Sequence, residues 1–211
     1  MSAQGDAFDV FYPIVPDASW VARFAPLGVR TLQLRLKDAP AEEVRRQIAE
    51  GLAVARRHGC QLIVNDYWRE AIEAGADYIH LGQEDLAAAD IAAIKSAGLR
   101  LGISTHSEAE LETALAASPD YVALGPIYET KLKVMQWAPQ GLLRVGAWKQ
   151  RIGPLPLVAI GGITPDRASD VVAAGADSIA VITDFMTAQD PDERVKLWLS
   201  WASARRQRQD A

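Results

Sequence analysis

Polar side chains occupy every second position of the segment TLQLRLK, residues 31–37. Strand alternation places Gln33, Arg35 and Lys37 on one face and three leucines on the other. The leucines suit a covering layer of helices, so in a barrel all three polar side chains are expected to point into the interior, where an inward Arg and Lys need a partner. A forked guanidinium beside a compact ammonium group is a combination that binds phosphate or pyrophosphate. We therefore predict an anion site here, with a structural ion-pair network or a solvated edge strand as the alternative.

Two carboxylates follow other apolar segments of the chain. Asn65 and Asp66 end the run LIVND, and Asp85 comes just after the run that ends in HLGQED. Proteins bind Mg²⁺ through one or two carboxylates together with substrate phosphates. Carboxylates and cations on one rim therefore predict a site for a magnesium–pyrophosphate complex. The alternative for Asp85 is that it caps the helix that follows.

Residues suited to phosphate contacts follow three later apolar segments: Ser104 and Thr105 in GISTHS, Gly161 and Gly162 in AIGGIT, and Ile182 and Thr183 in AVITDF. Hydroxyl groups donate to phosphate oxygens, and a glycine pair lets backbone amides approach a ligand closely. Together with the cationic segment, this gives two separate anion sites. Two such sites predict two phosphorylated substrates or one bisphosphate.

The segment LGPIYETKLKVMQWAPQG is long for a connection between a strand and a helix. Long connections of this kind are often active-site lids. Thr130, Lys131 and Lys133 are available there to bind phosphate, and the alternative is a solvated surface loop.

The chain lacks a recognisable pair of nucleophile and base. His58, His80 and His106 are scattered, and we interpret them as structural or exposed, because one histidine supplies neither a metal shell nor a catalytic triad. We therefore expect catalysis by positioning and electrostatics rather than by a covalent intermediate.

Eight short apolar runs alternate with amphipathic segments, and they are predicted to be the strands Phe8–Val15, Thr31–Lys37, Gln61–Asn65, Tyr78–Leu81, Arg100–Ser104, Tyr121–Leu124, Leu157–Ile160 and Ser178–Thr183. Helix starts are readable between them, as in Ser107 with Glu110 and in Thr164 before Pro165. Repeated units of this kind predict a parallel sheet with right-handed crossovers. The fold class expected is α/β, a single (β/α)8 TIM barrel domain over residues 1–211. An open doubly wound sheet is the competitor, but no GxGxxG follows the first strand.

The charge balance limits the classes of partner. The chain of 211 residues has 22 Lys+Arg and 27 Asp+Glu, a net charge of 22 − 27 = −5. This acidic balance argues against nucleic-acid binding. Cys60 is the only cysteine, and no apolar run approaches the roughly 20 residues that span a bilayer. We expect a cytoplasmic protein that binds neither nucleic acid nor membrane.

The C-terminal segment reads as a last amphipathic helix with a basic, solvated end at Arg205, Arg206 and Arg208. Trp198 and Trp201 are three residues apart, so they share a helix face. They are expected to pack on the barrel or on a partner subunit, which leaves a homo-oligomer open.

Taken together, these segments resemble the thiamine-phosphate synthase (thiamin phosphate pyrophosphorylase) family over roughly residues 10–185. The resemblance is carried by LQLRLKD, LIVNDYWREAIEAGADYIHLGQEDL, LGISTHS, DYVALGPIYETKLK and LVAIGGIT. It implies the (β/α)8 fold. It also implies a transferase that joins 4-amino-2-methyl-5-(diphosphooxymethyl)pyrimidine to 4-methyl-5-(2-phosphooxyethyl)thiazole, giving thiamine monophosphate and pyrophosphate by a dissociative displacement.

The resemblance also implies roles for individual residues. Asp66 and Asp85 match the Mg²⁺ ligands of the family. Its pyrimidine-diphosphate contacts correspond to Gln33, Arg35, Lys37, Asn65, Ser104, Thr130 and Lys133, among which Arg35, Lys37, Ser104 and Lys133 are expected to be catalytic. Its thiazole-phosphate contacts correspond to Gly162, Ile182 and Thr183.

One motif departs from the family. Its lid commonly reads PT-x-TK, whereas residues 129–133 read ETKLK. Leu132 removes one hydroxyl donor and Glu129 brings a carboxylate into an anion site, while Lys131 adds a cation that can compensate. Thr183 stands where serine is common in the family.

Two other functions are compatible with the same fold: a thiazole tautomerase and a non-catalytic phosphate-binding relative. The tautomerase would need neither the diphosphate cations nor the metal, and the binding protein would bind one ligand independently of metal and without turnover. The presence of Arg35, Lys37, Asp66 and Asp85 together favours the synthase.

Overall fold

The computed structural model describes residues 9–129 and 137–209. Its eight strands are β1 Phe11–Val15, β2 Thr31–Leu34, β3 Gln61–Asn65, β4 Tyr78–Leu81, β5 Arg100–Thr105, β6 Tyr121–Leu124, β7 Leu157–Ile160 and β8 Ser178–Val181. All neighbouring strands are parallel and follow the order of the chain, and β8 pairs with β1 to close a barrel. The predicted fold class is therefore confirmed and the open sheet is excluded.

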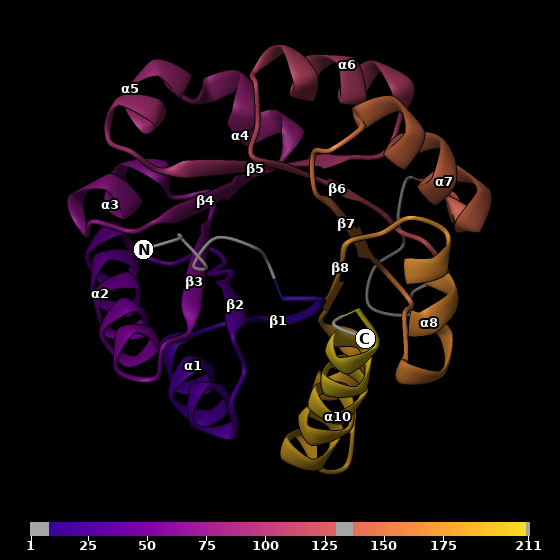
Figure 1. The fold of residues 1–211 in the computed structure, drawn as a ribbon. Helices are drawn as coiled ribbons and strands as arrows, with labels where there is room; N and C mark the ends of the chain where they lie inside the picture. The colour runs from indigo at the N-terminus through magenta and orange to yellow at the C-terminus, as the bar shows by residue number, and fades with distance from the viewer. Residues whose placement is uncertain (1–8, 130–136, 210–211) are drawn as a thin grey trace, which may run out of the picture.

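The helices surround the strands (Figure 1). They are α1 Ala18–Phe24, the 3₁₀ turn η1 Ala25–Leu27, α2 Ala41–Arg57, α3 Trp68–Glu73, α4 Gln83–Ala88, α5 Ile91–Ser96, α6 Glu108–Ala116, α7 Gly141–Ile152, α8 Pro165–Ala173, α9 Thr183–Met186 and α10 Pro191–Gln209. Ser107 caps α6 as predicted, because its hydroxyl accepts from the Glu110 amide at 3.3 Å. Pro165 begins α8, although Thr164 makes no side-chain capping bond.

Two buried layers result from strand alternation. Leu32, Leu34 and Leu36 pack between the sheet and the helices, as predicted. The barrel interior forms a second cluster, which includes Tyr12, Ile14, Ile63, Tyr78, Tyr121, Ala123, Val158 and Ala180. Gly102 makes this interior possible, since a Cβ atom there would collide with the ring of Tyr121. Bulky tyrosines thus fill much of the space that TIM barrels usually fill with branched aliphatic side chains.

Strand β2 ends earlier than predicted, at Leu34. The Arg35 amide still donates to the Val15 carbonyl at 2.8 Å, so the chain continues beside β1 for one more residue. Gln33 is buried in the barrel, Arg35 is half-buried and Lys37 is exposed. The prediction that all three point into the barrel is therefore wrong for Lys37, which lies beyond the end of the strand.

The C-terminal helix α10 packs against the barrel. Trp198 is fully buried and stacks on Phe11 with ring centroids 4.9 Å apart. The indole nitrogen of Trp201 donates to Ser169 at 3.1 Å. Both tryptophans therefore contact their own chain.

The basic end of α10 is not simply solvated, which corrects the prediction. Arg206 donates to Asp9 at 2.6 Å, and the Asp9 side chain is only 4% exposed. The bond joins two residues that are 197 positions apart, so the sequence pattern gave no sign of it.

In the described ranges, no helix has the length and apolarity to cross a membrane.

Candidate active site

The carboxyl ends of the eight strands meet at one mouth of the barrel, because all strands are parallel and adjacent. Most of the described candidates lie at or just beyond these ends: Arg35, Lys37, Asn65, Asp66, Asp85, Ser104, Gly162, Ile182 and Thr183. Gln33 lies one position before the end of β2. The topology therefore gathers residues that are up to about 150 positions apart in the sequence.

The carboxyl group of Asp85 lies close enough to that of Asp66 to act on it directly. Burial, followed by the charge of Asp85, raises the pKa of Asp66 to about 6, while Arg35 and the Gly82 amide act in the opposite direction. Asp66 has a φ of 68°, a left-handed conformation that aspartate tolerates better than most residues. Two carboxylates held this close repel each other when both are ionised, and a divalent cation would relieve that repulsion.

The donor set suits Mg²⁺, which prefers carboxylate oxygens and keeps several water or phosphate ligands. Among the described residues, no group of three or more His, Cys, Asp or Glu side chains is placed to hold a metal. A metal at Asp66 and Asp85 would therefore need further oxygen ligands from water or from a phosphorylated substrate.

Asp85 does not cap a helix. It lies within the first turn of α4, whose N-cap is Gly82, and the following helix α5 is capped by Asp90, which accepts from the Ala93 amide at 2.9 Å. The capping interpretation of Asp85 is therefore wrong. The break between α4 and α5 at Asp90 also replaces the one helix expected there.

His80 connects this mouth to the barrel interior. It is 6% exposed, and its Nδ1 lies 2.8 Å from the Tyr121 hydroxyl while its Nε2 lies 2.8 Å from the Ser104 hydroxyl. Burial, and secondarily the charge of Arg35, lowers the pKa of His80 to about 3. The imidazole is therefore neutral at physiological pH. His80 is structural, as predicted, but its contact with Ser104 was missed; the signal was its shared face with Tyr78 in the strand YIHL.

A buried donor faces the interior at Gln33. This side chain interacts with Tyr121, yet its Nε2 has no hydrogen-bond partner within bonding distance in the described structure. Buried polar groups without a partner cost free energy. An acceptor on a bound ligand would satisfy this donor.

The glycine pair has a packing role. A Cβ atom at Gly161 would lie 2.6 Å from Pro126, and one at Gly162 would lie 2.5 Å from the carbonyl oxygen of Glu129. The Ile127 amide also donates to Ile160 at 2.9 Å. Both glycines have positive φ angles, 102° and 65°. The close approach predicted for a ligand is thus made by the chain's own segment 126–129, which leads into the predicted lid.

The segment predicted to form a lid is only partly described. Thr130, Lys131, Leu132 and Lys133 lie outside the described residues. Glu129 is the last described residue before them.

Ile182 is the N-cap of α9 and Thr183 is the first residue of that helix, directly after β8. The next residue, Asp184, accepts two bonds from Arg194 at 2.6 and 2.7 Å and one from the Trp198 indole at 2.8 Å. These contacts fasten the turn to α10. They were not anticipated, because Arg194 and Trp198 lie on a helix whose docking only the fold decides.

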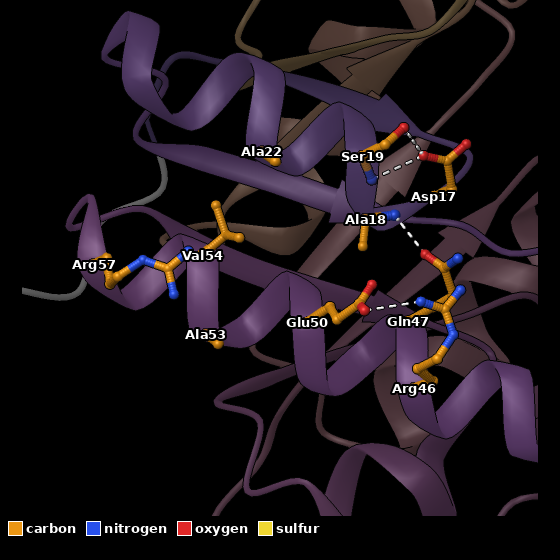
Figure 2. A pocket seen from close by; sticks show the side chains of 10 residues that line it. All are labelled: Asp17, Ala18, Ser19, Ala22, Arg46, Gln47, Glu50, Ala53, Val54 and Arg57. Carbon is orange, nitrogen blue, oxygen red and sulfur yellow. Dashed lines mark hydrogen bonds and ion pairs between the residues drawn. The ribbon is translucent and has the colours of Figure 1, made fainter.

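A hollow of about 510 Å³ lies elsewhere, between α1 and α2 (Figure 2). Its polar groups largely bind one another: Gln47 accepts from the Ala18 amide at 2.7 Å, and Arg46 pairs with Glu50 at 2.8 Å. The walls belong to the outer helices rather than to the strand ends that carry the candidates, so we do not assign the reaction to it.

A family model described as thiamine monophosphate synthase matches residues 12–185. The chain belongs to this family. It is 58% identical over 192 residues to the thiamine-phosphate synthase of Rhizobium etli, covering 91% of this chain and 94% of that one. It is 47% identical over 193 residues to the enzyme of the same name from Citrobacter koseri, covering 92% of each.

A solved structure agrees with this family. The thiamine phosphate pyrophosphorylase of Pyrococcus furiosus superposes with a TM-score of 0.81 at 27% identity, covering 93% of this chain and 96% of that chain. The thiamine monophosphate synthase family and the transferase class predicted from the sequence are thereby confirmed. The roles of individual residues stay predictions.

Proposed function

We propose that this chain is a thiamine-phosphate synthase that joins 4-amino-2-methyl-5-(diphosphooxymethyl)pyrimidine to 4-methyl-5-(2-phosphooxyethyl)thiazole. The observation that carries this proposal is the meeting of Asp66, Asp85 and Arg35 at one mouth of the barrel. A thiazole tautomerase or a phosphate-binding protein has no use for a carboxylate pair beside an arginine.

The pyrimidine diphosphate would lie across the ends of β2 to β5. Asp66 and Asp85 would hold Mg²⁺, which when bound neutralises the diphosphate and makes it a better leaving group. Arg35 supplies a permanent cation, and the exposed Lys37 supplies a second. Gln33, with its unpartnered amide, and the buried Asn65 are placed to contact the pyrimidine end. Ser104 would donate to the diphosphate, with Thr130 and Lys133 of the lid as further contacts.

The reaction needs no nucleophile from the protein. The carbon–oxygen bond between the pyrimidine methylene and the diphosphate breaks, and the diphosphate leaves with the electron pair. The thiazole nitrogen then donates its electron pair to the methylene carbon and forms the new carbon–nitrogen bond. The described site fits this chemistry, because it offers cations for the leaving group and a neutral His80 that carries no charge toward the methylene cation.

The thiazole phosphate would bind on the opposite side of the mouth, at Gly162, Ile182 and Thr183. Backbone amides and a hydroxyl at the ends of β7 and β8 form the recurrent phosphate site of TIM barrels. Both substrates are small phosphorylated molecules, and we propose that the protein meets them in the cytoplasm.

The test is formation of thiamine phosphate from the two substrates, with Mg²⁺ or with EDTA, read as thiochrome fluorescence. We expect product only with Mg²⁺. Asp85→Ala should abolish it, whereas Glu84→Ala, an exposed carboxylate one position earlier, should not. A folded protein that binds thiazole phosphate but forms no product would contradict the proposal and favour a tautomerase or a binding protein. Leu132 and Glu129 would then be the first residues to replace.

A further inference from the structure

We propose that Tyr121 and His80 are positioning residues that direct the Ser104 hydroxyl proton toward the diphosphate of the substrate. This inference rests on the proposed function, because it assumes that an anion binds beside Ser104. It assigns to two buried interior side chains, and to the half-buried Ser104, a role that neither the fold nor the family name supplies.

The three residues form a continuous chain of hydrogen bonds. His80 bridges Tyr121 and Ser104 with two contacts of 2.8 Å, one at each ring nitrogen. Its ring also stacks on that of Tyr121, with centroids 5.5 Å apart and planes 27° apart. Tyr121 is fully buried and hydrogen bonds in turn to Tyr12, which is also buried. Both ring nitrogens of His80 thus take part in hydrogen bonds. The stacking against Tyr121 also holds the imidazole ring in one orientation.

A neutral imidazole has one N–H donor and one acceptor, so its tautomer decides the direction of the whole chain. In one direction, Tyr12 donates to Tyr121, Tyr121 donates to Nδ1 of His80, and Nε2–H donates to Ser104. The serine proton is then left to point outward. In the reverse direction, Ser104 donates to Nε2 and offers only lone pairs to the mouth of the barrel.

The two directions of the hydrogen-bond chain differ in whether the Ser104 hydroxyl can donate to a bound anion. A hydroxyl that already accepts from Nε2–H can donate its own proton to a diphosphate oxygen, in a charge-assisted bond. A hydroxyl that donates to the ring would repel the same oxygen. Bound diphosphate therefore selects the Nε2–H tautomer, and Tyr121 supports it by donating to Nδ1. His80 stays neutral in this role, and it neither gives a proton to the substrate nor takes one from it.

The Ser104 backbone is held independently of this chain. The Gln83 side-chain amide donates to the Ser104 carbonyl at 2.7 Å, from the first residue of α4. Replacing His80 should therefore release the hydroxyl proton without moving the strand. This separates a positioning role from general packing of the interior.

The first measurement is the ¹⁵N NMR spectrum of the histidine side chains. Only three histidines are present, so the buried His80 can be assigned by loss of its signals in His80→Leu. With Mg²⁺ and inorganic pyrophosphate bound, we expect shifts typical of the Nε2–H tautomer. An Nδ1–H tautomer in that complex would overturn the proposal.

The second measurement is a double-mutant cycle on the rate of thiamine phosphate formation. We expect Ser104→Ala to lower kcat by about a hundredfold and His80→Leu by about ten- to a hundredfold. The double variant should be no slower than Ser104→Ala alone, and His80→Gln, whose amide can donate in place of Nε2–H, should recover part of the rate. Multiplied losses and no recovery would assign His80 to packing alone.

Tyr121→Phe and Tyr78→Phe form a matched pair. Both tyrosines lie in the barrel interior, but the Tyr78 hydroxyl accepts from Arg100 at 2.7 Å, whereas the Tyr121 hydroxyl lies 2.8 Å from Nδ1 of His80. We expect Tyr121→Phe to lower kcat several-fold and Tyr78→Phe to change it less than twofold. Equal effects would overturn the relay. Absence of turnover in the unmodified protein would instead contradict the proposed function, and the relay with it.

Discussion

Arg35 is a half-buried cation whose charge acts on both Asp66 and His80. Because it stands just beyond β2, it can contact a ligand at the mouth without a conformational change in the barrel. Its guanidinium can form two parallel bonds to phosphate oxygens, which lysine cannot do.

We therefore expect Arg35→Ala to abolish turnover while the protein stays folded. Arg30→Ala is the control, because Arg30 is an exposed arginine at the other end of the same strand. Steady-state rates and thermal unfolding of both variants check this. Near-normal turnover of Arg35→Ala would remove Arg35 from the mechanism.

Asp66 is expected to make the folded protein less stable as the pH rises, which is the opposite of the effect of most carboxyl groups. Its folded pKa of about 6 lies above the ordinary value of 3.8, so the folded state binds the proton more tightly than the unfolded state. The stabilisation is complete below pH 4 and is lost as the pH rises through about 6. In the absence of metal at pH 7.5, the Asp66→Asn variant should therefore be more stable than the unmodified protein. Its free energy of unfolding should be higher by about 1–2 kcal/mol, allowing for solvent screening.

Urea unfolding in EDTA, at pH values from 4 to 8, measures this difference. Asparagine tolerates the left-handed conformation of residue 66, so the substitution tests charge rather than backbone strain. Adding Mg²⁺ should raise the stability of the unmodified protein and leave that of Asp66→Asn unchanged. A difference that is independent of pH, or a response of both proteins to Mg²⁺, would contradict the carboxylate pair as a metal site.

Among the elements, the end of β7 supports the segment 126–129, which leads into the predicted lid. The amides of Ile127 and Tyr128 donate to the carbonyls of Ile160 and Gly161 at 2.9 and 3.0 Å. These bonds extend the pairing of β6 with β7 beyond the ends of both strands. Glycine is therefore needed at positions 161 and 162 for two reasons: the backbone has a positive φ there, and the segment 126–129 packs too closely to leave room for a Cβ atom.

We expect Gly162→Ala to reduce stability more than Gly98→Ala does. Both glycines have positive φ, which costs about 1–2 kcal/mol for alanine. Only Gly162 also has neighbours that a Cβ atom would hit, which adds about 1–3 kcal/mol. Urea unfolding measures this difference, and the KM for the thiazole phosphate should rise in Gly162→Ala alone. Equal unfolding free energies of the two variants would show that the segment 126–129 can move to accommodate the added Cβ atom at little cost.

At the scale of the whole molecule, α10 joins the end of the chain to its beginning. Asp9 precedes β1, receives Arg206 from α10, and accepts a bond from its own neighbour Val10 at 2.9 Å. Its backbone carbonyl accepts from Ser178 at 2.6 Å, so the same residue also contacts β8. This cluster lies where the first and last strands meet to close the barrel.

Arg206→Ala should lower the free energy of unfolding by about 2 kcal/mol, because it leaves a buried carboxylate without its cation. Lys196→Ala provides the control: Lys196 pairs with Glu193 on the same helix, but both side chains are more than half exposed. Its loss should cost less than about 0.5 kcal/mol. Chemical denaturation of both variants measures the difference, and equal losses would show that Asp9 is solvated without Arg206.

Most of the fold could be predicted from the order and character of the apolar runs. Runs such as LIVN, YVAL and LVAI are continuous and apolar because both faces of a parallel strand are buried, and their bounds match β3, β6 and β7 closely. Glycines and capping residues between them fixed the alternation with helices. The residue types at the strand ends identified the candidate site, because packing alone would not choose Arg35, Asp66 or Asp85 at such positions.

Which of these residues contact one another depends on the closed barrel and could not be predicted from the motifs. The contacts of His80 with Ser104 and Tyr121 span 24 and 41 positions, and that of Arg206 with Asp9 spans 197. Periodicity describes neighbours on one element, whereas such contacts depend on how the barrel closes and on how far each side chain is buried. For the same reason the exposure of Lys37 and the effect of Asp85 on the pKa of Asp66 followed from the fold and not from the motifs.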